Sequence, residues 1–142
     1  MVPVQHVAVS VGSGVILGLL MRSWSAGAAC CFIGIFIDAD HFFDFWNNRG
    51  FRVSVREFLD FCYHGTSRRF FDLLHGFEFI PAIWALTTLP GWHNIGWGLT
   101  VGYTIHLLCD QFCNTHLNRW TYFFCYRLFV GFDARRIVKG PA

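Results

Sequence analysis

The segment Gly34-Ile-Phe-Ile-Asp-Ala-Asp-His41 places three polar side chains at the end of a long apolar run. A second segment, Tyr103-Thr-Ile-His-Leu-Leu-Cys-Asp110, carries a histidine and an aspartate four residues apart inside another apolar run. An ionisable side chain within an apolar membrane helix costs on the order of 3 kcal/mol on insertion scales, so such residues usually mark a functional site. These segments therefore predict both the class of fold and the position of a site.

The composition is that of a membrane protein. The chain has 142 residues, of which 54% are hydrophobic and 14% charged, and it includes 17 Phe and 6 Trp. Soluble domains average about 25% charged residues, so this chain has little charged surface for contact with water. The mean hydropathy of +0.42 agrees with that interpretation. A net charge of +2 without a basic stripe argues against nucleic acid as a partner.

Four apolar segments are near the length that spans a bilayer, about 20 residues, and they cover residues 4–21, 26–46, 73–89 and 95–112. Helical spacing of apolar residues predicts an interfacial amphipathic helix over 53–63, and the aromatic segment 119–132 is a second candidate. We therefore expect one all-α membrane domain over 1–142, a bundle of about four transmembrane helices with one or two interfacial helices. Gly14 and Gly18 have the small-x-x-x-small spacing that permits close helix contact. A signal peptide is disfavoured, since no Lys or Arg precedes the first run.

The basic residues indicate the orientation of this bundle. They gather in the second connection and after the fourth segment, whereas the first connection has Arg22 alone. The positive-inside rule then puts both termini in the cytoplasm, most simply of a bacterial inner membrane. The two basic regions contain Arg49, Arg52, Arg56, Arg68 and Arg69, and then Arg119, Arg127, Arg135, Arg136 and Lys139.

With this topology the histidines and acids of the apolar segments meet on the cytoplasmic side. Residues four or three apart, such as His106 and Asp110 or His75 and Glu78, project from one helical face. Imidazole nitrogen and carboxylate oxygen together suit a divalent cation; zinc is favoured, with manganese or iron as alternatives. More than four candidates are present, so one or two ions are expected. The candidates are His6, Asp38, Asp40, His41, His75, Glu78, His106 and Asp110.

Each of these residues also has a simpler interpretation. A single histidine in a membrane helix is commonly an interhelical hydrogen-bond donor. Asp38 and Asp40 would then cap a helix end, and Asp44 is expected to face water or to pair with an arginine. The six cysteines form no Cys-x-x-Cys pair and are interpreted as reduced, structural residues. A buried polar network or a proton path is the alternative to a metal site.

The ordered motifs resemble those of a family of small membrane-bound metal-dependent hydrolases, which is distantly similar to zinc-dependent phospholipase C and P1-type nucleases. The resemblance rests on an upstream His6, on Asp38-Ala-Asp-His41, on Leu73-Leu-His-Gly-Phe-Glu78 and on Gly102-Tyr-Thr-Ile-His-Leu-Leu-Cys-Asp110. The central motif departs from the common His-Arg-x-x-Thr-His-Ser form and is closer to a His-Ser-Trp-Glu variant of uncharacterised membrane proteins. The resemblance implies metal-binding roles for His6, Asp38, Asp40, His41, His75, His106 and Asp110.

The function that these residues and the resemblance favour is hydrolysis of a phosphoester or a lipid head group at the cytoplasmic membrane surface. Glu78 would be the general base or would orient His75, while Arg68 and Arg69 would hold an anionic leaving group. The partners expected are membrane lipids, with a membrane-protein partner or a second copy of the chain as further candidates. The alternative is a non-enzymatic membrane subunit with a structural metal or a buried His/Asp network. An ion path is a third alternative, although its polar residues would extend through the full membrane depth.

Overall fold

The computed structural model describes residues 3–51, 54–64 and 69–139. No β-strand occurs in these ranges, so the prediction of an all-α fold is confirmed. The elements are α1 (Pro3–Leu20), α2 (Trp24–Phe36), η1 (Ile37–Asp40), α3 (His41–Arg49), α4 (Val55–His64), η2 (Phe77–Phe79), α5 (Ile80–Ala85), η3 (Leu86–Thr88), α6 (His93–Cys113), α7 (Phe124–Phe129) and α8 (Ala134–Ile137).

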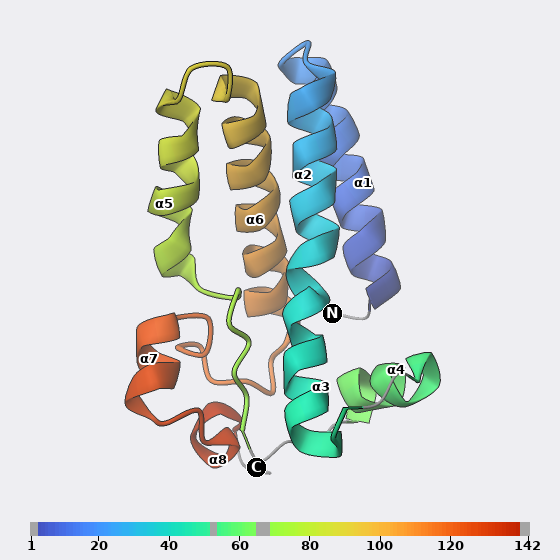
Figure 1. Ribbon diagram of the computed structural model, residues 1–142, viewed down its shortest axis with the longest axis vertical. Coiled ribbons are helices and arrows are strands. Elements are labelled where there is room, and N and C mark those ends of the chain that lie inside the picture. Colours follow the sequence, from blue (N-terminus) through green and yellow to red (C-terminus); the bar gives the residue numbers. More distant parts are fainter. Residues whose placement is uncertain (1–2, 52–53, 65–68, 140–142) are drawn as a thin grey trace.

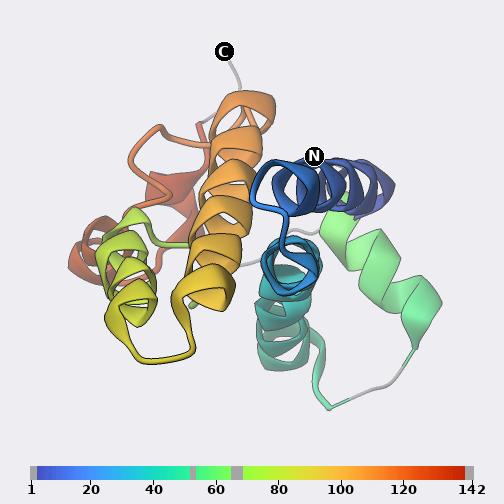
Figure 2. The same cartoon turned by 90° about the horizontal axis from the view of Figure 1, so that it is seen from above.

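Helices α1, α2, α5 and α6 lie side by side in the upper half of the molecule (Figure 1). Helix α2 packs most extensively against α6 and α1, and α6 also contacts α5. Seen from above, α6 lies between α5 and the α1/α2 pair (Figure 2). Helix α3 continues α2 into the lower half, where α4 lies on one side and α7 and α8 on the other. The lower ends of α1, α2 and α6 therefore meet where the two halves join.

Glycines allow the backbones of α1, α2 and α6 to come into contact. A Cβ atom added at Gly27 would lie 2.6 Å from the carbonyl oxygen of Gly14, and one added at Gly14 would lie 2.7 Å from that of Gly27. Gly98 and Gly102 of α6 pack in the same way against the backbone of α2. The close contact predicted from the spacing of Gly14 and Gly18 is thus confirmed, and α2 is the partner.

The prediction of four transmembrane helices is wrong. Within the described ranges, one continuous helical stretch, Trp24–Arg49, is long and apolar enough to cross a membrane. Core helices of soluble proteins and signal sequences meet the same criterion, so this stretch is weak evidence for a span. The first segment forms a shorter apolar helix, and the fourth, in α6, contains enough Gly, Thr and His to lower its hydropathy.

The third predicted segment is interrupted for a different reason. Residues 73–76 are not helical, and the helical part begins only at Phe77 and runs to Thr88 through two short 3-10 turns. Polar side chains from other elements bind the backbone of residues 71–76, so the apolar pattern of this segment does not become a helix.

The two predicted interfacial helices differ in outcome. Helix α4 occupies most of 53–63, although residue 53 lies outside the described ranges. The aromatic segment 119–132 contains only the six-residue helix α7. Phe132 and Gly131 that follow it both have positive φ angles, 57° and 66°, and a left-handed backbone ends a helix.

Enlarging Gly27 should separate α1 from α2. Gly27→Val forces its side chain against the Gly14 backbone, and overpacking of this kind costs about 2 kcal/mol. The midpoint of thermal unfolding, followed by circular dichroism, should fall clearly below that of the wild type. Gly12→Ala on the same helix pair is the control, because no atom lies within 4 Å of a Cβ added there. An equal loss in both variants would contradict the packing described.

Candidate metal centre

Four side-chain atoms from three parts of the chain converge at the junction of the two halves. The Nε2 atoms of His75 and His106 are 3.3 Å apart. Asp38 Oδ1 lies 3.3 Å from the first and 3.2 Å from the second. Asp110 Oδ2 lies 3.6 Å from the Nε2 of His75 and 3.3 Å from that of His106. Three buried residues, His75, His106 and Asp110, and the partly exposed Asp38 therefore form a group that is able to hold a metal ion.

The second nitrogen of each imidazole ring fixes its tautomer. His106 Nδ1 is 2.9 Å from the carbonyl oxygen of Gly34, which accepts a hydrogen bond only. His75 Nδ1 is 3.0 Å from Asp40 Oδ2, which also accepts the amide of Leu74 at 2.8 Å. In their neutral forms both rings therefore carry the proton on Nδ1, which leaves two Nε2 lone pairs 3.3 Å apart. Two lone pairs and two carboxylates at this distance repel unless a proton or a metal ion lies among them.

His6 and Asn114 hold the outer oxygen of Asp110. The Nε2 atom of His6 lies 3.0 Å from Asp110 Oδ1, and the His6 ring stacks on His106 with centroids 4.3 Å apart. Asn114 Nδ2 donates to the same oxygen at 3.0 Å and to the Tyr122 hydroxyl at 2.7 Å. His6 was predicted as a ligand; its contact in the structure is with the carboxylate of Asp110.

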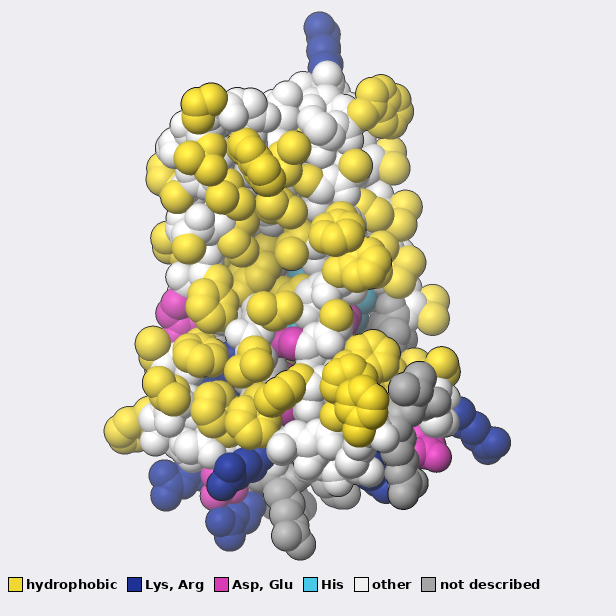
Figure 3. Space-filling model, in the orientation of Figure 1, with side chains coloured by type: hydrophobic (Ala, Val, Ile, Leu, Met, Phe, Trp, Pro, Cys, Tyr) yellow, Lys and Arg dark blue, Asp and Glu magenta, His cyan; other side chains and the backbone are white. Residues whose placement is uncertain are grey.

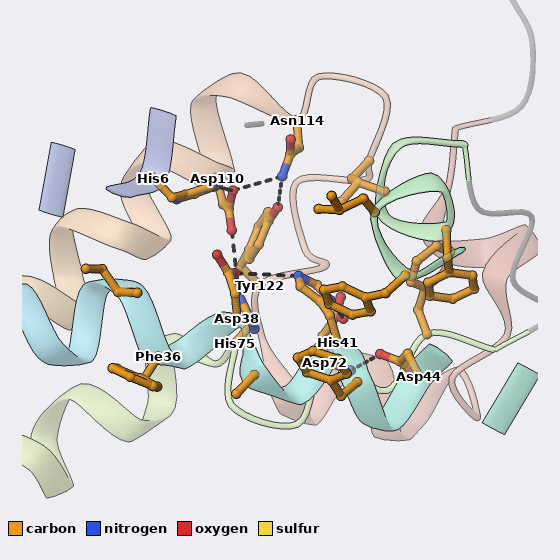
Figure 4. Close-up of a pocket in the computed structure, with 18 of the residues that line it drawn as sticks. His6, Phe36, Asp38, His41, Asp44, Asp72, His75, Asp110, Asn114 and Tyr122 are labelled. Atoms are coloured by element: carbon orange, nitrogen blue, oxygen red, sulfur yellow. Dashed lines mark hydrogen bonds and ion pairs between the residues drawn. The ribbon is translucent and has the colours of Figure 1, made fainter. Parts of the chain in front are cut away.

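His41 and Asp72 form a second polar cluster beside the first. His41 Nδ1 is 3.1 Å from Asp72 Oδ1, and its Nε2 is 3.6 Å from Asp38 Oδ1. Together with Asp40 and His75, or with Asp44 and Asp72, His41 belongs to two further groups with metal-ligand spacing. Figure 4 shows His41 between the Asp38 side of the site and the Asp72 side.

The irregular segment 71–76 carries His75 into the site, and side chains from α3 and α6 hold it. Asp44 accepts the amides of Phe71 and Asp72 at 2.9 and 3.0 Å, so its predicted exposure to water or pairing with arginine is wrong. Asp72 adopts a positive φ of 39°, which aspartate tolerates better than most residues. The Tyr103 hydroxyl donates to the carbonyl of Leu74 at 2.5 Å. The position of His75 is thus determined by polar contacts rather than by a helix.

Arg127 binds the same segment from below. Its guanidinium is fully buried and donates to the carbonyls of His75 at 2.7 Å, Asp72 at 2.8 Å and Phe71 at 3.1 Å, and also to Thr121. Burial lowers the pKa of Arg127, and the charges of Asp72 and Asp40 oppose that shift. Arg127 therefore acts as a positioning residue for the backbone that carries Asp72 and His75.

The electrostatics of the site favour a cation. Burial alone would lower the pKa of His75, but Asp40 and Asp38 outweigh burial and hold the pKa well above its usual value. Burial would raise the pKa of Asp72, but His41 outweighs it and keeps that pKa below its usual range. Asp40 Oδ1 is buried and has no hydrogen-bond partner. In the absence of a metal ion, a proton on His75 offsets part of this negative charge, and a bound cation would replace that proton.

A cavity of about 640 Å³ opens beside these residues. It is lined by aromatic residues of α2, α3 and α4 and by a set of polar residues, namely His6, Asp38, His41, Asp44, Asp72, His75 and Asp110. Within the group of four, Asp38 is the most accessible, since its side chain is 28% exposed. In the space-filling view, acidic and histidine atoms are visible between the apolar upper half and the basic lower half (Figure 3).

Two predicted residues, Glu78 and Arg69, lie away from the converging atoms. Glu78, expected to act as base or to orient His75, instead accepts the amides of Phe124 and Cys125 at 3.0 Å, where α7 begins. Asp40 orients His75 in its place. Arg69 is exposed, and its backbone pairs with Asp133, so it does not line the cavity. Arg68 lies outside the described residues.

Sequence reasoning missed Asp72, Tyr103 and Arg127. Asp72 lies one residue before the third apolar segment begins, so the apolar pattern does not single it out. Arg127 is the one interior charge of an aromatic segment, which is the signal that could have identified it. Nothing in the sequence pattern around Tyr103 indicates that its hydroxyl binds backbone more than 25 residues earlier.

Comparison with protein-family models, with curated proteins and with solved structures gave no match. The resemblance to the metal-dependent hydrolases therefore stays a prediction, and the inferences below rest on the geometry of this chain.

Removing two of the four donors should abolish metal binding. We expect about one divalent ion for each wild-type chain and none in the His106→Ala/Asp110→Ala variant, measured by elemental mass spectrometry after gel filtration. His93→Ala is the control, because its ring contacts the Thr87 carbonyl and does not line the cavity. A folded wild type that stays metal-free after exposure to zinc, manganese and iron would leave a buried polar network as the explanation.

Replacing Arg127 should destabilise the fold. Arg127→Met leaves several buried carbonyls without a donor, at about 1–3 kcal/mol for each unsatisfied group, so a total loss of at least about 3 kcal/mol is expected. Urea unfolding, followed by tryptophan fluorescence, measures it. Arg135→Met provides a matched substitution at a side chain that is 90% exposed, where no measurable loss is expected. Similar midpoints for both variants would show that Arg127 does not hold this segment.

Proposed function

We propose that this protein is a metal-dependent hydrolase that cleaves a phosphoester at a membrane surface. The observation that carries the proposal is the convergence of two imidazole nitrogens and two carboxylate oxygens beside a cavity large enough for a substrate, with Asp38, His75 and Asp110 lining that cavity. Substrate pockets commonly measure about 300–1,000 Å³. His75, His106, Asp38 and Asp110 would hold the ion.

The spacing of the donors supports zinc as the ion. Donors about 2.0–2.1 Å from a tetrahedral zinc ion are themselves about 3.3 Å apart. Five of the six distances among the four atoms lie between 3.2 and 3.6 Å. A mixture of imidazole and carboxylate also suits manganese and iron, so metal analysis has to include them.

The contacts behind the donors support metal ligation in another way. Histidines that bind metals usually donate their other N–H to a carboxylate or to a backbone carbonyl, which fixes the ring and raises its basicity. His75 has Asp40 in this role, and His106 has the Gly34 carbonyl. Both rings are thus oriented before any ion arrives.

The surrounding residues suit hydrolysis of an ester. A divalent ion held by His75, His106, Asp38 and Asp110 would supply Lewis-acid polarisation of an ester oxygen and activation of water. Asp38 lies on the cavity side, where water and substrate have access. His41 also lies on that side. Burial alone would lower the pKa of His41, but Asp72 outweighs burial and raises it to about 9, so this ring is suited to donate a proton to a leaving group.

A membrane location is part of the proposal. Exposed apolar side chains cover the upper helices, among them Ile16, Leu20, Trp24 and Phe32, while most basic side chains visible in Figure 3 lie in the lower half. In this proposal the apolar upper half contacts lipid, and the basic lower half faces the cytoplasm. The first residues of α1 and helix α8 lie below that apolar part (Figure 1), in keeping with cytoplasmic termini.

A structural metal site in a non-enzymatic membrane subunit is the second candidate. One observation favours it: four protein donors would complete a tetrahedron, as in structural zinc sites, whereas catalytic zinc sites usually keep one position for water. Asp38 distinguishes the candidates, because it is the donor that water could replace. A partner protein or a second copy of the chain belongs to this candidate.

Hydrolysis of bis(4-nitrophenyl) phosphate by the zinc- or manganese-loaded protein tests the proposal. We expect turnover in the wild type and in His93→Ala, and a loss of at least 100-fold in His106→Ala/Asp110→Ala. Asp38→Asn should keep a bound ion, with weaker affinity, yet lose at least 100-fold in kcat. The structural site would be favoured by two results together. Every protein except the double variant would bind metal, and the wild type would hydrolyse none of several kinds of phosphoester.

A further inference from the structure

The cavity beside the candidate metal centre has a second wall, which is aromatic. Phe36 and Phe42 flank the donor-bearing turn of η1, and Phe58 and Phe61 of α4 face the same space. Phe36 precedes Asp38 by two residues, and Phe42 directly follows His41. The apolar surface therefore begins next to the donor atoms and leads away from them towards α4.

Packing holds this aromatic wall in place. Phe42 stacks on Phe58 with ring centroids 3.9 Å apart and an angle of 3° between the planes. Behind them Phe45, which is buried, packs edge-on against Phe58 at 5.8 Å and against Phe61 at 5.6 Å. A rigid wall loses little conformational entropy when a ligand binds to it.

The charged residues that line the cavity limit which head group a bound ligand can have. Among the described residues that line it there are four aspartates and neither lysine nor arginine. The groups that could attract an anion are therefore a bound cation and the imidazole rings, such as His41 beside Asp72. Because each further negative charge would face the aspartates, a diphosphate or a nucleotide is a poor fit, whereas a group with one negative charge is tolerated.

We propose that the substrate is a phosphodiester with one negative charge and a long alkyl chain. The phosphodiester lies at the donor atoms, and the alkyl chain lies along the wall formed by Phe36, Phe42, Phe58 and Phe61. This inference rests on the proposed function for the position of the phosphate. It adds the class of substrate and assigns aromatic residues of α2, α3 and α4 to substrate binding.

Binding of unreactive ligands to the zinc-loaded protein tests the inference separately from turnover. Isothermal titration compares dodecyl methyl phosphate, dimethyl phosphate and dodecyl phosphate. Each buried methylene group strengthens binding by about fourfold, so dodecyl methyl phosphate should bind at least 30-fold more tightly than dimethyl phosphate. It should also bind more tightly than dodecyl phosphate, whose head group carries more negative charge near neutral pH.

Two variants show where the chain binds. In Phe42→Ala/Phe58→Ala the advantage of the dodecyl chain should fall below fivefold. In Phe129→Ala, which removes an 84% exposed ring of α7 that does not line the cavity, the advantage should stay at the wild-type value. An unchanged advantage in the first variant, an equal loss in both variants, or tighter binding of dodecyl phosphate would overturn the inference.

Kinetics separate this inference from the proposed function. Equal kcat/KM values for 4-nitrophenyl methyl phosphate and 4-nitrophenyl dodecyl phosphate would refute the substrate class and leave hydrolysis intact. The opposite result is tighter binding of the dodecyl ligand that is lost in Phe42→Ala/Phe58→Ala, with no hydrolysis of either ester. It would refute hydrolysis and leave the alkyl-binding wall intact.

Discussion

The close approach of three helix backbones is the constraint on which the candidate site depends. Glycines let α1 and α6 contact α2 directly, and Gly34 of α2 leaves room only for Ser10 of α1. The lower ends of these helices consequently meet, and His6, Asp38, His106 and Asp110 reach one another. Larger side chains at the contacts would push the helices apart, and donor distances of 3.2–3.6 Å would not survive such a shift.

The polar residues divide into those that converge and those that hold the converging residues in place. His75 depends on Asp40 for its ring and on Arg127 and Tyr103 for its backbone. This arrangement offsets the cost of burying several carboxylates, because each lies within hydrogen-bond distance of amide or imidazole nitrogens. The charge that remains is negative, and it lies next to an apolar wall. A cation and an amphiphilic ligand are the chemical complements of those two surfaces.

The sequence predicted the helical class and most of the converging residues, because ionisable side chains in apolar runs are conspicuous. Gly14 and Gly18 likewise indicated a close helix contact. The number of membrane spans was wrong, since run length was counted without the polar content of α6 and without the break before Phe77. The role of Glu78 could not be foreseen, because the start of α7 that it binds is 46 residues away. The spacing of residues also does not predict the contacts of Asp44 and Arg127 with backbone atoms.

The converging atoms come from segments that are distant in sequence, and this has a consequence for folding. His106 and the Gly34 carbonyl are 72 residues apart, and His75 and His106 are 31 residues apart. Contacts of such long range form late, after the entropy of closing large loops has been overcome. The centre is therefore assembled only when α1, α2, α6 and the segment around His75 have all reached their native positions. An ion held there would connect these segments much as a cross-link does, so its binding free energy would add to the stability of the folded state.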